Sequence, residues 1–243
     1  MNILLTNDDG YQANGINFLK EYFEKKDHKV FIVVPDREKS GSSHSITLKD
    51  TIKLIDHKDN LWILNGTPAD CVILGLLGLI KEKIDFVVSG INHGPNIGRD
   101  IIYSGTAAAA REAGFSKIPS MALSIDCWEK YLDFEVAEYF LNKYFNKLSK
   151  SIKKNFFYNI NFPNIKLEEL NGVQMTVPCP NHYYMDELLH FEVPFQGKYY
   201  WVNGYVPNYK LQKGTDAMAI KNNYISVSPV KIFPEAEKIN FKL

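Results

Sequence analysis

The 243-residue sequence has little cysteine and no excess charge of either sign. Its three cysteines stand far apart without a Cys-x-x-Cys pair, which argues against a disulfide framework or a thiolate zinc site and fits a reducing cytoplasm. The 28 basic residues balance the 28 acidic ones, so bulk charge gives no reason to expect binding to nucleic-acid polymers. The cysteines are Cys71, Cys127 and Cys179.

Long hydrophobic runs are also missing. The longest nearly apolar run, Cys71 to Ile80, has ten residues, whereas a membrane-spanning helix needs about twenty. The apolar start at Ile3 soon meets Asp8 and Asp9 and has no basic region before it, unlike a signal peptide. We therefore expect a cytoplasmic protein without a membrane contact.

Two phosphate-binding motifs are absent as well. No Gly-x-Gly-x-x-Gly follows the first expected strand, and no Gly-x-x-x-x-Gly-Lys-Ser/Thr occurs. A dinucleotide site and a Walker-type nucleoside triphosphate site are therefore not expected.

The first two thirds of the chain alternate short apolar runs with segments of helical spacing. This alternation predicts an α/β fold with a mostly parallel sheet covered on both faces. The expected strands are Asn2–Thr6, Val30–Val34, Ile46–Ile55, Phe86–Ser89 and Ser120–Ser124. One expected helix follows Gly15, and another starts at Pro68, with Thr67 as its N-cap and Asp70 in the capping-box position. Two more cover Thr106–Ala113 and Phe134–Ile152.

After about residue 156 the pattern changes to short aromatic and β-branched runs, which predict strands and hairpins added to the sheet or to a partner subunit. These runs are Phe157–Asn161, Val173–Val177, Lys198–Val202 and Tyr224–Val227. We expect one domain over residues 1–243, with a core of about 1–165 and an extension of about 166–243. Its aromatic residues predict burial between subunits: Tyr199, Tyr200, Trp201, Tyr205 and Tyr209.

Three loops that follow expected strands are rich in glycine and oxygen-bearing side chains, and they should converge where parallel strands end. Asp8 and Asp9 are adjacent there; they form either an ordinary turn or, because neighbouring carboxylates repel, a divalent-cation site. Ser40 and Asn92 could add neutral oxygens. Such a set suits Mg²⁺ or Mn²⁺ better than zinc.

Ser104, Gly105 and Thr106 precede an alanine-rich helix, so they predict either a phosphate site at its N-terminus or simple N-capping. His44 lies in a Ser/Gly-rich loop and is either a functional group or a surface histidine.

Taken in order, seven segments resemble the SurE family of survival-protein-E 5′/3′-nucleotidases over nearly the whole chain. They are Ile3–Gly10, Val33–Thr47, Asn65–Val72, Val88–Ala110, Ile118–Ser124, Asn159–Asn164 and Gly214–Pro229.

This resemblance implies a Rossmann-like core and a metal-dependent phosphatase, a hydrolase that acts as a 5′-nucleotidase on nucleoside monophosphates. It implies one divalent cation per subunit, with Asp8, Asp9, Ser40 and Asn92 as ligands. It also implies a C-terminal segment that extends into a homodimer or homotetramer.

The mechanism expected from these residues is attack of metal-activated water on a phosphomonoester. Asn96, with Ser104, Gly105 and Thr106, would bind the remaining phosphoryl oxygens. The proton carrier is either His44 or a carboxylate such as Asp8 or Asp9.

Two rival functions use the same fold. A haloacid-dehalogenase-type phosphatase would form an aspartyl phosphate, but its two aspartates alternate along the strand end rather than standing side by side. A non-catalytic nucleotide-binding module would need phosphate donors but no set of cation ligands.

Overall fold

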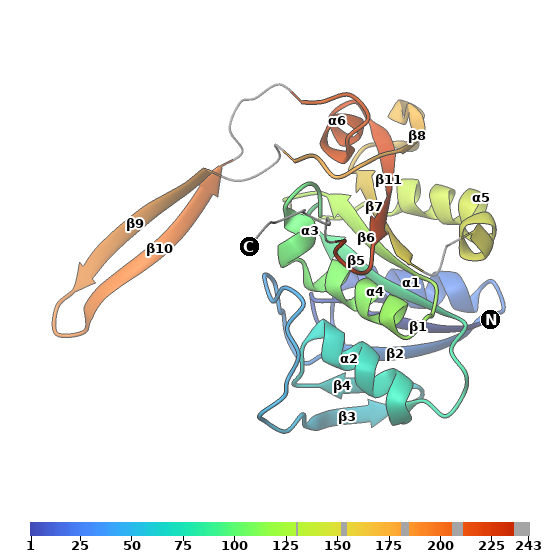
Figure 1. Ribbon diagram of the computed structural model, residues 1–243, viewed down its shortest axis with the longest axis horizontal. Helices are drawn as coiled ribbons and strands as arrows, with labels where there is room; N and C mark the ends of the chain where they lie inside the picture. Colours follow the sequence, from blue (N-terminus) through green and yellow to red (C-terminus); the bar gives the residue numbers. More distant parts are fainter. Residues whose placement is uncertain (130, 152–154, 181–184, 206–210, 236–243) are drawn as a thin grey trace, which may run out of the picture.

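A computed structural model describes residues 1–129, 131–151, 155–180, 185–205 and 211–235. Its body is a nine-stranded sheet with helices on both faces (Figure 1). The strands of the sheet are β1 (Asn2–Thr6), β2 (Lys29–Pro35), β3 (Leu54–Lys58), β4 (Leu61–Leu64), β5 (Phe86–His93), β6 (Ser120–Asp126), β7 (Phe156–Pro163), β8 (Gly172–Met175) and β11 (Tyr224–Lys231).

The strand order across the sheet is β3-β4-β2-β1-β5-β6-β7-β11-β8. All neighbouring pairs are parallel except β3–β4 and β7–β11. The predicted α/β class and mostly parallel sheet are therefore confirmed. The helices are α1 (Asn14–Glu24), α2 (Pro68–Leu74), α3 (Asp100–Tyr103), α4 (Gly105–Phe115), α5 (Glu135–Ser151) and α6 (Asp216–Lys221). A π-helical turn at Gly75–Leu79 and a 3₁₀ turn at Leu167–Glu169 complete the described elements.

Successive residues of the central strand β1 point to opposite faces of the sheet, as strand geometry requires. Ile3 and Leu5 belong to the apolar cluster with α1 and α5, whereas Leu4 belongs to the cluster with α2 and α4. Because both faces are covered, β1 is a continuous apolar run. No helix within the described ranges is long and apolar enough to cross a membrane.

Helix α2 begins where the sequence predicts. The Asp70 N–H donates to Thr67 Oγ1 at 3.2 Å, and the Thr67 N–H donates to Asp70 Oδ2 at 2.9 Å, which forms a capping box. Asp70 also accepts hydrogen bonds from the Thr47 N–H and hydroxyl, at 2.9 and 2.7 Å. This buried carboxylate therefore ties the long loop after β2 to the start of α2.

The strand predicted over Ile46–Ile55 is wrong over most of its length. Strand β3 starts only at Leu54 and pairs with β4, a four-residue strand that the sequence pattern did not reveal. Residues 46–53 are held by side chains instead: Thr47 bonds to Asp70, and the Lys53 N–H donates to Asn65 Oδ1 at 2.7 Å. Tertiary contacts have overridden the alternating pattern there.

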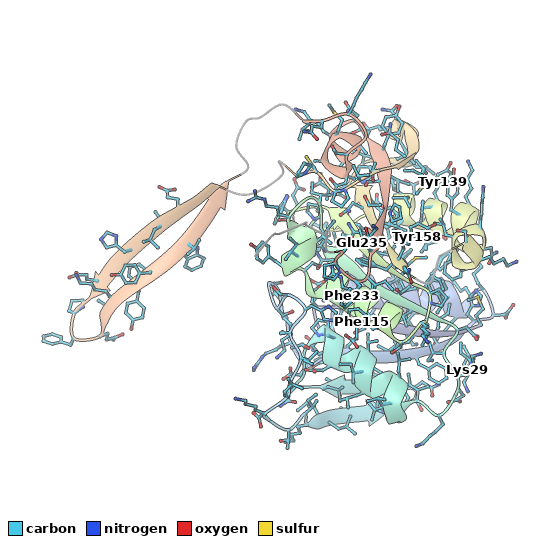
Figure 2. The ribbon with its side chains drawn as sticks, in the orientation of Figure 1. Lys29, Phe115, Tyr139, Tyr158, Phe233 and Glu235 are labelled. Carbon is cyan, nitrogen blue, oxygen red and sulfur yellow. The ribbon has the colours of Figure 1, made fainter. Side chains whose placement is uncertain are left out.

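Strands β9 (Met185–Val193) and β10 (Gly197–Tyr205) form a separate antiparallel hairpin that projects from the body (Figure 1). Away from its base, its side chains extend from the ribbon without other described segments against them (Figure 2). Leu188, Phe191, Tyr200 and Trp201 are all more than half exposed. Tyr209, which we expected to add to this aromatic set, lies outside the described residues, as does Ile152, the last residue of the helix expected from the sequence.

The hairpin leaves and rejoins the body at one place. Val177 and Thr215 form an isolated parallel bridge, and the Val177 N–H donates to the Gly214 carbonyl at 3.1 Å. Asp216, fully buried, accepts hydrogen bonds from the N–H groups of Cys179 and Gly98 at 2.8 and 2.9 Å. The base of the hairpin is therefore bonded to the loop that follows β5.

Candidate functional site

A cavity of about 460 Å³ opens at the carboxyl edge of the sheet, where the loops after β1, β2 and β5 meet the start of α4. This is the edge where ligands bind in open α/β sheets. The predicted site residues that line it are Asp8, Ser40, Asn92, Asn96 and Ser104.

Asp8 lies at the N-terminus of α4 and is 4% exposed. Its Oδ2 accepts the Thr106 N–H at 3.1 Å, and its Oδ1 accepts the Thr106 hydroxyl. Burial raises the pKa of the Asp8 carboxyl, and the Thr106 hydrogen bonds oppose that rise. The positive end of the helix dipole therefore faces a carboxylate of this chain itself.

The contact between β1 and α4 depends on Gly105. A Cβ atom at this position would lie 2.8 Å from Ser42 Oγ, 2.9 Å from Asp8 Cβ and 2.9 Å from Pro68 Cγ. Three loops therefore meet at a point with space for glycine alone. Ser42 Oγ is buried there without a hydrogen-bond partner among the described residues, a polar group that the sequence analysis did not single out.

Asp9 lies beside Asp8 but lines an adjoining cavity, which shares only His93 with the first. Asp9 Oδ2 accepts the His93 N–H at 3.3 Å. Burial and, next, the negative charge of Asp8 raise the pKa of Asp9 to about 7. Within the described chain, no lysine or arginine forms an ion pair with either carboxylate. Among the described residues, the two neighbouring carboxylates therefore have no positively charged partner to offset their burial.

This raised pKa predicts how the stability of the metal-free protein depends on pH. Folded Asp9 holds its proton up to about pH 7, whereas the unfolded residue releases it near the ordinary pKa of 3.8. The folded state binds the extra proton between these values, so the free energy of unfolding should fall as pH rises from about 4 to about 7. Chemical denaturation in EDTA at a series of pH values should show that the free energy of unfolding falls more steeply with pH for the wild type than for Asp9→Asn. Equal slopes would contradict the raised pKa of Asp9.

Ser40 and Asn92 have free oxygen lone pairs to offer. The Ser40 hydroxyl donates to Glu38 Oε1 at 2.7 Å, which leaves lone pairs on Oγ. The Asn92 amide donates to the Gly94 carbonyl at 2.8 Å, and its Oδ1 makes no side-chain hydrogen bond in the described part of the chain. Two carboxylates, a hydroxyl and an amide oxygen form a hard, all-oxygen donor set, which fits Mg²⁺ or Mn²⁺. No cluster of three His, Cys, Asp or Glu side chains that could hold a metal occurs among the described residues.

Asn96 is anchored by a buried polar network from neighbouring strands. Its N–H donates to Asn161 Oδ1 at 2.8 Å, and its Nδ2 donates to Ser124 Oγ at 2.8 Å. Its carbonyl accepts from Asn159 Nδ2 and Asn161 Nδ2 at 2.7 and 3.1 Å. Asn159 and Asn161 lie in the segment Asn159–Asn164 that resembles the family, but no role for them was predicted. Their polar side chains within an apolar strand were the signal that could have marked them as part of the site.

The predicted phosphate set divides in two. Ser104 lines the cavity, and its Oγ accepts the Ala107 N–H at 3.0 Å, so its own hydrogen remains free to donate. Gly105 and Thr106 do not line the cavity. The N–H and the hydroxyl of Thr106 both donate to Asp8, so neither is left for a phosphate. Both N-capping and anion binding therefore occur at this helix start, with Asp8 as the anion.

His44 is not brought to the cavity. Positive φ angles at Gly41 and Ser43 turn its loop away, along the side of α4. There His44 Nε2 lies 2.7 Å from Glu112 Oε2, and its ring stacks on Phe115 with centroids 5.7 Å apart.

A second cavity, of about 520 Å³, lies between the end of α4 and the segment after β11. Phe115, Phe233 and Glu235, labelled in Figure 2, are among its lining residues. None of the predicted site residues lines it, so the carboxyl edge of the sheet remains the candidate site.

Comparisons with known proteins agree with this geometry. The family model described as survival protein SurE matches residues 3–185. The 5′-nucleotidase SurE of Thermoanaerobacter sp. (strain X514) is 38% identical over 234 residues, covering 95% of this chain and 92% of that protein. The protein of that name from Aquifex aeolicus (strain VF5) is 38% identical over 232 residues, covering 94% and 91%. A crystal structure of the SurE protein from Aquifex aeolicus matches with a TM-score of 0.82 and 35% identity, covering 96% of this chain and 94% of that one. Similarity in sequence and in fold therefore spans almost the whole chain.

Proposed function

The chain belongs to the SurE family, and from this membership and the cavity geometry we propose that it is a divalent-metal-dependent 5′-nucleotidase. It hydrolyses nucleoside monophosphates to nucleoside and phosphate. The observation that carries the proposal is the convergence of Asp8, Ser40 and Asn92 on one cavity, with Asp9 beside it and no cation of the described chain paired with the carboxylates. Residence in the cytoplasm stays a prediction.

The cation supplies two things when bound: polarisation of a phosphoryl oxygen and a lower pKa for the attacking water. Thr106 keeps Asp8 oriented as a ligand, and the Lys39 N–H holds the Asp8 carbonyl at 2.7 Å, which sets the Ser40 loop against it. Ser104 donates its free hydroxyl hydrogen to the phosphoryl group, and the anchored Asn96 lines the cavity beside it.

Proton transfer falls to Asp8 in this proposal, because Asp8 is the carboxylate of the pair that lines the cavity. His44 faces Glu112 and does not line the cavity, so it is not within reach of a phosphoryl group there. The same geometry disfavours an aspartyl-phosphate route, because Asp8 is buried beneath Thr106 and Asp9 lines a different cavity.

The test is an assay of phosphate release from a panel of nucleoside 5′- and 3′-monophosphates, with EDTA and with added Mg²⁺ or Mn²⁺. We expect release from 5′-monophosphates that EDTA abolishes and at least one of the two cations restores. Undiminished phosphate release in EDTA would contradict the requirement for a metal ion. Nucleotide binding without release would favour the non-catalytic module.

We also expect the protein to be a homodimer or homotetramer. The projecting hairpin exposes a row of large apolar side chains that a monomer leaves in water, and exchange of such segments between copies is a low-cost route to an oligomer. Light scattering should report at least a dimer at micromolar concentration, and replacement of residues 180–213 by a short linker should yield a monomer. A monomeric intact chain would contradict the prediction.

A further inference from the structure

The cavity has lining residues that the phosphate chemistry does not use. Besides the polar residues at the metal end, its lining includes Tyr103, Trp128, Val202 and Gly204, which come from three separate segments. Tyr103 ends α3, Trp128 follows β6, and the last two belong to β10. One cavity therefore joins a set of oxygen ligands to an aromatic and apolar wall.

Both aromatic side chains on this wall are open to solvent. Trp128 is 73% exposed and Tyr103 is 60% exposed. Single exposed aromatics are ordinary on protein surfaces, but these two line the same cavity as a candidate phosphate site, so their rings are accessible to whatever the phosphate carries. A flat, apolar group with a π-system fits such a wall.

Backbone contacts place Tyr103 and Trp128 beside the loops that carry the candidate metal ligands. The Tyr103 carbonyl accepts the Ser43 N–H at 2.9 Å, which ties α3 to the loop that carries Ser40. The six-membered ring of Trp128 lies over Gly94, whose φ is 107°; a Cβ there would sit 3.8 Å from the ring atoms Cη2 and Cζ3. Because Gly94 lies between Asn92 and Asn96, the indole reaches directly over the loop that forms the metal end.

We propose that Trp128 and Tyr103 form the base-binding end of the cavity, where the nucleobase of the substrate stacks on an aromatic ring. This inference rests on the proposed function, because it assigns the lining residues that the metal and phosphate roles leave unused. The cavity volume of about 460 Å³ falls within the usual range of about 300–1,000 Å³ for small-molecule sites. Stacking uses the π-face that every base has, so purine and pyrimidine nucleotides should both depend on it.

The experiment compares two substrates that share a 5′-phosphate on ribose: adenosine 5′-monophosphate, which has a base, and ribose 5-phosphate, which has none. Trp128→Ala in the full-length, metal-loaded protein should lower kcat/KM for the nucleotide by about 5- to 150-fold, the range for loss of one base–aromatic stack. It should leave kcat/KM for ribose 5-phosphate close to the wild-type value. Trp128→Phe, which keeps a ring, should recover most of the loss.

Tyr131→Ala is the matched control, because Tyr131 is 82% exposed in the same segment and does not line the cavity. Tyr131→Ala should leave kcat/KM unchanged for both substrates. Equal losses with both substrates for Trp128→Ala would overturn the proposal, since they would mean that the indole only positions the Gly94 loop. An unchanged kcat/KM for the nucleotide would overturn it too.

Failure of the proposed function has a different signature. If the wild-type protein releases phosphate from neither substrate, the nucleotidase proposal fails. The base-stacking proposal is then tested by calorimetric measurement of the affinity for adenosine 5′-monophosphate. Nucleotide binding that Trp128→Ala weakens would then still support stacking, and binding that it leaves unchanged, or absent binding, would overturn it.

Discussion

Replacing Asp8 by asparagine is expected to lower kcat/KM by more than the roughly 100-fold upper range seen for residues outside the ligand set. Both Asp8 oxygens accept hydrogen bonds from Thr106, and each has a further lone pair for a cation. An amide has only one acceptor oxygen. Whichever way the substituted side chain turns, its NH₂ group replaces an oxygen that accepts from Thr106, and only one oxygen is left to bind a cation.

The same substitution should leave the metal-free fold intact. Burial raises the pKa of Asp8, so the charged carboxylate is costly in the folded state without a cation, and a neutral amide removes that cost. Asp27→Asn is the control, because Asp27 is exposed in the turn before β2, at the opposite edge of the sheet. The role of Asp8 as a metal ligand is tested by steady-state kinetics and by calorimetric titration with metal. An Asp8→Asn protein with a near-normal kcat/KM and a near-normal metal affinity would contradict that role.

The second large effect is expected from Gly105→Ala. Alanine adopts helical angles readily, so the added methyl acts through its contacts alone: it would lie under 3.0 Å from Ser42, Asp8 and Pro68. Relief requires that β1 and the Ser42 loop move away from α4. A misplacement of about 1 Å at a catalytic site costs on the order of 100-fold, and we expect a loss of kcat/KM of at least about that size.

Stability should fall less than activity in this variant, by about 1–3 kcal/mol, the usual cost of overpacking. Gly78→Ala is a matched control in an exposed helical turn, where an added Cβ meets no atom within 4 Å. Urea denaturation and kinetics on both variants separate the two effects. A Gly105→Ala protein with wild-type kcat/KM would show that the three-loop contact does not set the geometry of the site.

Local patterns in the sequence are enough to place most of the sheet and the polar lining of the candidate cavity. Buried parallel strands are short apolar runs, and residues that follow them must meet at one edge. That rule alone predicts the meeting of Asp8, Ser40 and Asn92, which line one cavity. The capping box at Thr67 depends only on residues three apart, and it too is predictable.

What the sequence could not show depends on contacts between distant segments. Residues 46–53 alternate like a strand, but Asp70, from α2, holds them by side-chain bonds. Thr106 has the pattern of a phosphate donor, yet Asp8, 98 residues away, takes its hydrogen bonds. His44 turns from the cavity because of two positive φ angles, which no periodicity reveals.

The bridge between Val177 and Thr215 has a consequence for how this chain can change in evolution and in engineering. Because the excursion starts and ends at paired residues, a change of length at the tip of the hairpin, between Val193 and Gly197, affects the body only through loop-closure entropy, about 0.6 kcal/mol for each doubling. The tip can therefore be lengthened or exchanged for a foreign module without a change in sheet register, whereas Cys179, Val202 and Gly204 have contacts with the body or the cavity that must be kept. The tip is a natural insertion point, where new binding specificity could be grafted onto a segment whose base lies beside the candidate cavity.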